Sequence, residues 1–166
     1  MTNSPRILFV AVTLLAAAVG PFAQGVVGDA LTAGDPSKPA VRHRIVVEVT
    51  NDGIEQWTMA LNNVENLRKT FGTESTQIEV VGHGKGLGIM LARNAALADR
   101  MRKLFDGGVV FAACENSMRK HGVTKADLHP FATTVDSGVA EVVRKQEAGW
   151  SYLKTCLLYT SDAADE

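Results

Sequence analysis

The chain has 166 residues, of which 46% are hydrophobic and 21% are charged, and this length and composition suit one globular domain rather than two. Its 17 basic and 18 acidic side chains nearly cancel, which argues against a nucleic-acid-binding protein, because such proteins usually carry a clustered basic excess. The chain also lacks the low-complexity tracts that are typical of disordered proteins.

The N-terminal residues have the pattern of a secretory signal peptide. Arg6 precedes an apolar run over residues 7–19, which is too short to cross a membrane, since a spanning helix needs about 20 apolar residues. Small residues follow the run, and we expect cleavage near Gly25. The sequence therefore predicts a signal peptide over 1–25, a flexible lead-in over 26–41, and a periplasmic or secreted protein without a stable membrane anchor. A retained membrane anchor is the alternative.

The folded part begins with a predicted strand and a predicted helix. Residues 44–50 are a β-branched run that contains Glu48, a pattern typical of a strand covered on most sides. Asp52, with Glu55 three residues later, predicts a helix N-cap and a capping box. Apolar residues at helical spacing then predict an amphipathic helix over 54–71.

A second predicted strand, over residues 77–81, leads into a glycine-rich turn over 82–88 that carries Lys85. The turn lacks the Gly-Lys-Ser/Thr ending of a P-loop and the G-x-G-x-x-G spacing of dinucleotide-binding proteins. Two interpretations remain. The backbone passes close to a neighbouring element, which we favour, or the turn binds an anionic ligand.

The rest of the core continues the alternation of helices and strands. The expected elements are a helix over 95–105, a strand over 109–113, a short helix from Cys114 to Gly122, a small cap over 124–127 and a strand over 132–135. A closing helix is capped by Ser137, and its inner face carries Val139, Val142 and Val143. This alternation predicts an α/β sandwich with a mainly parallel sheet of about four to five strands.

Residues 156–166 show neither helical nor strand periodicity. They resemble the translation of a sequencing adapter, so we expect them not to belong to the natural chain; a genuine disordered tail is the alternative. Without Arg6 and the three acidic residues of this tail, 16 basic and 15 acidic side chains remain. The single domain predicted over 42–155 contains one cysteine, Cys114, which is therefore buried, reactive or paired between molecules.

Cys114 is the candidate functional residue. It ends a predicted strand just before a helix, where backbone N–H groups and the helix dipole favour a thiolate, although the charge of Glu115 opposes this. We expect its sulfur to be open to solvent, and the alternative is a buried cysteine that only fills space. His83 and Lys85 follow the second strand and are the nearest candidate charge partners at the same edge of the sheet.

Other kinds of site have little support in the sequence. The histidines do not have metal-ligand spacing, and the Gly-x-Ser-x-Gly motif of hydrolases is missing, so we expect neither a metal nor a cofactor. Trp150 and Tyr152 are expected to be packing residues rather than a platform that stacks nucleic-acid bases.

Four blocks of the core resemble the DsrE/DsrF-like family of small sulfur-relay proteins. They are IVVEVTNDG, IEVVGHGKGL, VVFAACENSMRKHGV around Cys114, and VDSGVAEVVRKQEAGWSYLK, and together they span about residues 42–154. The resemblance implies an α/β/α sandwich that assembles into trimers or hexamers, in which a cysteine after the third strand carries persulfide sulfur between partner proteins. Cys114 occupies that position. The predicted export signal distinguishes this chain from the cytoplasmic members of the family. A sulfur relay in this protein would have to work in an oxidising compartment.

We therefore expect an exported persulfide or thiol carrier, a transfer module rather than a turnover enzyme. Cys114 would be its nucleophile, and His83 and Lys85 would shape the local potential. The backbone N–H groups of Asn116 and Ser117 would stabilise the anion. Its partners would be further copies of the chain and a sulfur donor or acceptor protein. The alternative is a non-catalytic oligomeric binding or assembly protein with a structural cysteine.

Overall fold

The computed structural model describes residues 43–155, nearly all of the domain predicted over 42–155. The predicted signal peptide (1–25), lead-in (26–41) and adapter-like tail (156–166) lie outside these residues. Within the part of the chain that the structure describes, no helix is both long and apolar enough to cross a membrane.

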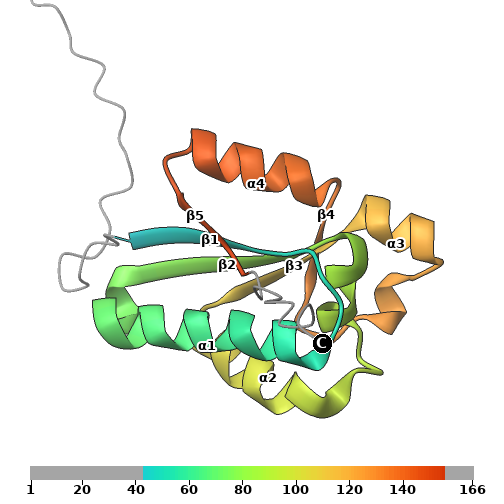
Figure 1. Ribbon diagram of the computed structural model, residues 1–166, viewed down its shortest axis with the longest axis horizontal. Helices are drawn as coiled ribbons and strands as arrows, with labels where there is room; N and C mark the ends of the chain where they lie inside the picture. Colours follow the sequence, from blue (N-terminus) through green and yellow to red (C-terminus); the bar gives the residue numbers. More distant parts are fainter. Residues whose placement is uncertain (1–42, 156–166) are drawn as a thin grey trace, which may run out of the picture. The chain divides into compact units, whose positions relative to one another are not determined.

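Five strands form one sheet in which every neighbouring pair is parallel (Figure 1). In chain order they are β1 (His43–Val49), β2 (Thr76–Gly82), β3 (Val110–Cys114), β4 (Thr133–Val135) and β5 (Ser151–Lys154). Their order across the sheet is β4-β3-β2-β1-β5. The predicted α/β class and parallel sheet are thus confirmed. The sequence did not locate β5, because a mostly exposed segment of four residues carries no clear periodicity.

Helices cover both faces of the sheet (Figure 1). The helices α1 (Ile54–Phe71) and α2 (Ala98–Asp106) pack on one face, and α4 (Gly138–Glu147) packs on the other. A shorter helix, α3 (Glu115–His121), follows β3 directly. The glycine-rich segment after β2 forms the 3-10 helix η2 (Gly84–Met90). The result is the predicted three-layer sandwich.

The two faces of the sheet are packed differently. On the side of α1 and α2, alternate strand residues such as Val47, Val80 and Phe111 join the helices in the main core. On the side of α4, the apolar cluster is small and consists of Val46, Val81, Ala112 and Val142. The buried carboxylates of Glu48 and Glu79 also lie on that face. The layer under α4 therefore combines a small apolar cluster with two buried carboxylates.

The prediction that Val139 and Val143 lie on the inner face of the closing helix is wrong. These side chains are 58% and 47% exposed, whereas Val142 is buried. The reason is electrostatic. The carboxylate of Glu79 is buried under the helix and needs a partner, and Lys145 provides it with a 2.5 Å ion pair. The helix is therefore rotated so that Lys145 faces the sheet.

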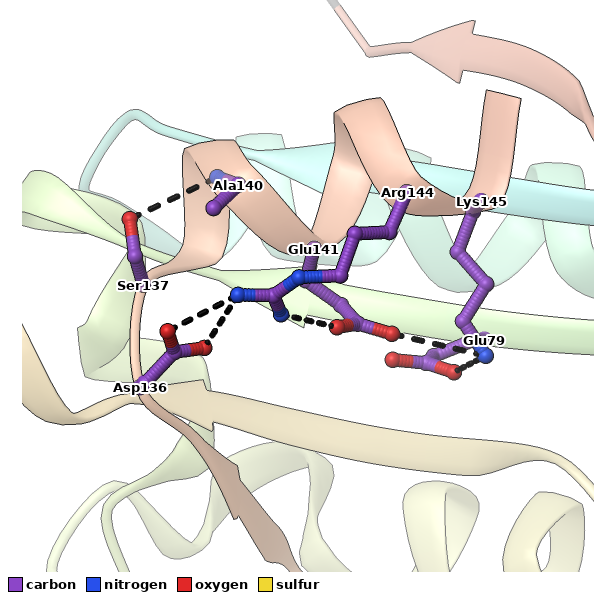
Figure 2. A network of polar contacts seen from close by, with 7 residues as sticks. All are labelled: Glu79, Asp136, Ser137, Ala140, Glu141, Arg144 and Lys145. Atoms are coloured by element: carbon purple, nitrogen blue, oxygen red, sulfur yellow. Dashed lines mark hydrogen bonds and ion pairs between the residues drawn. The ribbon is translucent and has the colours of Figure 1, made fainter. Parts of the chain in front are cut away.

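Figure 2 shows the ion pairs that hold α4 in place. Arg144 lies 2.8 Å from the carboxylates of both Asp136 and Glu141, and Lys145 reaches Glu141 at 3.5 Å. Asp136 belongs to the turn between β4 and α4, so this network ties the helix to the strand before it. The start of the helix at Gly138 is thereby fixed against the carboxyl edge of the sheet.

Two of the three predicted helix caps are present. The Ser137 hydroxyl accepts a hydrogen bond from the first turn of α4, and residues 124–127 form a capping box. The predicted box of Asp52 and Glu55 is wrong. Gly53 is the N-cap of α1, and the Asp52 carboxylate instead accepts a 2.9 Å hydrogen bond from the Gly53 N–H.

The glycine-rich segment passes very close to its neighbours, which confirms the favoured interpretation of the turn. A β-carbon added at Gly86 would lie 2.0 Å from the carbonyl oxygen of Val49, at the end of β1. One added at Gly88 would lie 2.5 Å from the indole ring of Trp57. Both positions therefore need glycine for lack of space rather than for backbone conformation.

We expect Gly86→Ala to lower the free energy of unfolding by about 3 kcal/mol or more, since the clash is with backbone that cannot move alone. Gly122→Ala is the matched control. Gly122 has a φ of +64°, but a β-carbon there meets nothing within 4 Å, so backbone strain alone should cost about 1–2 kcal/mol. Urea unfolding measures both variants, and equal costs would contradict the steric explanation.

Candidate functional site

Cys114 is the last residue of β3 and the N-cap of α3. It is a free cysteine and only 3% exposed, so the expectation that its sulfur lies open to solvent is wrong. The reason is its position. Its side chain points to the face that α4 covers, and the turn before α4 closes over it. The burial alone would fit a structural cysteine, so the groups around the sulfur decide what it can do.

The groups around the Cys114 sulfur are hydrogen-bond donors. The Ser117 N–H donates to the sulfur at 3.4 Å. Burial raises the pKa of the thiol, but the Ser117 hydroxyl and the N–H groups of Gly138, Ser117 and Asn116 outweigh burial and hold the pKa below its ordinary value. The surroundings therefore favour the thiolate, and the two amides predicted from the sequence, those of Asn116 and Ser117, both contribute.

The start of α4 provides a donor that the sequence did not reveal. Gly138 is the first residue of α4, and its N–H faces the sulfur, so the N-termini of two helices converge there. A hydrogen bond of 3.3 Å from the Asn116 N–H to the Asp136 carbonyl joins the two helix starts. Only the pairing of β3 with β4 brings the second helix to this point, and the local sequence around Gly138 carries no sign of it.

His83 lies beside Cys114 but has another direct partner. It follows Gly82, which pairs with Ala113, so His83 and Cys114 end adjacent strands. Its Nε2 atom lies 2.7 Å from the carboxylate of Glu48. A β-carbon on Gly138 would lie 2.7 Å from the Cβ of His83. His83 therefore contacts Gly138. The contact leaves no room for a side chain at position 138, so only glycine fits there.

Glu48 is a buried carboxylate that supports His83. The Tyr152 hydroxyl donates a 2.5 Å hydrogen bond to Glu48, and the Lys154 ammonium lies 3.7 Å away. Burial raises the pKa of Glu48, but the hydrogen bonds from Tyr152 and His83 and the nearby cations lower it below its usual range. Burial and the Glu48 carboxylate raise the pKa of Tyr152 to about 12. Sequence analysis missed this cluster, because β5 was not located.

The remaining predicted charges do not reach the sulfur. Lys85 lines a cavity of about 350 Å³ on the outer side of η2 and is not among the groups that shift the pKa of Cys114. The Glu115 carboxylate accepts a 2.8 Å hydrogen bond from Thr134 and lies 3.9 Å from Lys125, so its charge is engaged away from the thiol. Over residues 43–155, no three His, Cys, Asp or Glu side chains are grouped as metal ligands.

Ser117 connects the thiol to that cavity. Its hydroxyl is among the groups that lower the pKa of Cys114, and it accepts a 2.8 Å hydrogen bond from the N–H of Gly84, which lines the cavity. Ser117 and Gly84 therefore link the surroundings of the thiol to the wall of the cavity.

We expect Ser117→Ala to raise the pKa of Cys114, because the variant removes the hydroxyl donor and keeps the backbone donor. The rate of alkylation by iodoacetamide against pH, in a Cys156→Ser background, measures the change. Alkylation at neutral pH should be about tenfold slower, the loss expected when one hydrogen bond to a charged group is removed. Glu115→Gln is the control and should leave the profile unchanged. A shift of similar size in both variants would contradict the role of Ser117.

Comparison with known proteins agrees with this architecture. The model of the DsrE/DsrF-like family matches residues 45–155. A protein of unknown function from Methanobacterium thermoautotrophicum, MTH1491, is 32% identical, with a TM-score of 0.63 over 68% of this chain and 98% of its own.

A second protein of unknown function, BT1422 from Bacteroides thetaiotaomicron, is 16% identical and shares the fold, with a TM-score of 0.52 over 67% of this chain and 93% of its own. None of the curated proteins matches. Because the family model covers most of the chain, and all of the described helices and strands except the first two residues of β1, the protein belongs to the DsrE/DsrF-like family.

Proposed function

We propose that the protein carries persulfide sulfur on Cys114 within a sulfur relay. At the level of the family, sulfur relay is the function that the match suggests. The observation that carries the finer proposal is the set of donors at Cys114, namely one hydroxyl and the N–H groups at the starts of two helices. A cysteine that only fills space needs no such donors.

The transfer needs no cofactor and no outside oxidant. The Cys114 thiolate attacks the terminal sulfur of a polysulfide, and a new S–S bond forms as the S–S bond of the donor breaks. The electron pair of the broken bond leaves with the shortened polysulfide. The product on Cys114 is a persulfide anion, and the donors that stabilise the thiolate also stabilise this anion. An acceptor thiolate then attacks the outer sulfur of the persulfide. It takes that sulfur and releases the Cys114 thiolate.

Burial of the sulfur restricts the donor and protects the product. Cys114 is 3% exposed, so a small linear donor fits the proposal better than a bulky one. Exclusion of solvent also slows oxidation of the thiolate and loss of sulfur from the persulfide. Such protection suits a carrier in an oxidising compartment, and we propose that residues 1–25 export the chain to the periplasm or out of the cell.

The proposal includes assembly with further copies of the chain. Val139 and Val143 lie one turn apart on the outer face of α4, and Tyr152 of β5 is also exposed. Exposed apolar side chains of this kind are typical of surfaces that a partner covers. A trimer or hexamer would bury them, and a sulfur donor or acceptor protein would be the second kind of partner.

The second candidate is a non-catalytic binding or assembly protein with a structural cysteine. The low exposure of Cys114 favours it. Under this alternative the thiol reacts only when the protein unfolds.

Exposure of the folded Cys156→Ser protein to inorganic polysulfide distinguishes the two candidates. Intact mass spectrometry should show the mass of one added sulfur atom, which disappears after treatment with a reducing agent. A second variant, Cys114→Ala in the same background, should gain no mass. If Cys114 gains sulfur only in denaturant, with the folded protein unchanged, the carrier function is wrong and the structural alternative holds.

A further inference from the structure

The cavity beside η2 gathers basic side chains from three separate parts of the chain. Lys85 comes from η2, Arg93 from the loop that follows, and His121 from the end of α3. The cavity has a volume of about 350 Å³, within the range of small-molecule sites. Its wall also contains Asn94 and the carboxylate of Asp52.

None of these three side chains forms an ion pair with another residue in the 43–155 range. The Asp127 carboxylate interacts with the charge of Arg93 and so competes with a bound anion for it. The Thr124 amide and hydroxyl chiefly lower the pKa of that carboxyl, and the charge of Arg93 adds to the effect. The Asp52 carboxylate accepts a hydrogen bond from its own turn, at Gly53. Within residues 43–155, Lys85 and Arg93 therefore form no ion pair, although the Asp127 carboxylate interacts with the charge of Arg93 and the Asp52 carboxylate lies in the same wall.

A second hollow, between α1 and α2, shows that basic side chains in a hollow do not by themselves indicate an anion-binding site. It also has basic side chains and a similar volume of about 340 Å³. There, however, Arg100 is paired with Glu65 at 2.5 Å, and Arg68 donates to the carbonyls of Leu104 and Gly107. Those arginines hold the two helices together, whereas Arg93 forms no ion pair with any residue in the described part of the chain.

We propose that the cavity lined by Lys85, Arg93 and His121 binds a small polar molecule through a tetrahedral oxyanion group. Arginine and lysine together are the usual partners of such a group. The cavity is larger than a bare oxyanion, so the ligand carries further polar atoms, which Asn94 and Asp52 are placed to contact. A sulfur oxyanion and a phosphorylated metabolite share this chemistry. The site depends on the cavity alone and does not require that Cys114 carry sulfur.

Isothermal titration of the full chain with inorganic phosphate and with thiosulfate tests the site, at constant ionic strength set with chloride. Saturable binding is expected for at least one of the two anions. Lys85→Gln and Arg93→Gln should each weaken it by about threefold to tenfold, the range for losing one charged partner. Asp52→Asn should strengthen it, because the variant removes the negative charge of the wall but keeps an oxygen for the Gly53 N–H.

Lys120→Gln is the matched control. Lys120 is an exposed lysine of α3, adjacent in sequence to His121, and it does not line the cavity. The variant changes the net charge by the same amount and should leave the affinity unchanged. An equal loss in Lys120→Gln and Lys85→Gln would mean that general charge, rather than a site, attracts the anion. Absence of saturable binding by both anions would also overturn the proposal.

Two further comparisons complete the test. Cys114→Ala should bind the anion as the parent protein does, so failure of the sulfur-carrier function and failure of this site give different results. Tighter binding of thiosulfate than phosphate would identify a sulfur oxyanion as the ligand class, and the reverse order would identify a phosphorylated one. The unfolding midpoint of each variant without anion checks that the fold is intact, since bound ligand itself raises stability.

Discussion

The arrangement on which the site depends is the meeting of two helix N-termini at one buried sulfur. A buried thiol without partners stays protonated, because burial disfavours the charged form. Here the starts of α3 and α4 direct N–H groups at Cys114, and the Ser117 hydroxyl adds another donor. The donors outweigh burial, so the same position that hides the sulfur also favours its anion.

This meeting requires α4 to be held at a fixed place and rotation, and ion pairs do this. The Lys145 ammonium pairs with Glu79 under the helix, and Arg144 joins the helix to Asp136 in the preceding turn (Figure 2). An ion pair of this kind adds little net stability, since desolvation offsets most of the attraction. Its effect is directional, because only one rotation of the helix satisfies the Glu79 carboxylate. That rotation leaves Val139 and Val143 exposed.

The glycine-rich segment separates two chemical environments. Its backbone packs so tightly on the end of β1 that Gly86 tolerates no side chain. The N–H of Gly84 contacts Ser117 and so reaches the thiol. Gly84 also lines the cavity, together with Lys85 and Gly88 of the same segment. A single backbone segment therefore lies between the buried thiol and the cavity for which we propose an anionic ligand.

The architecture and the central residue could both be predicted from local patterns in the sequence. The periodicity of residues 44–50, 54–71 and 109–113 was sufficient for an α/β fold, and the place of Cys114 between a strand and a helix indicated the amides of Asn116 and Ser117. These features are local, because hydrogen bonds within one helix turn follow from the order of residues. Local patterns also predicted the caps at Ser137 and at residues 124–127.

Which distant groups meet at the site depends on how the strands and helices pack. The N–H of Gly138 reaches Cys114 through the pairing of β3 with β4, and Glu48 reaches His83 and Tyr152 through the pairing of β1 with its neighbours. Such contacts depend on strand order and helix rotation, which no local pattern specifies. For the same reason, exposure of the sulfur was misjudged. Whether a side chain at the end of a strand meets solvent depends on what covers that end.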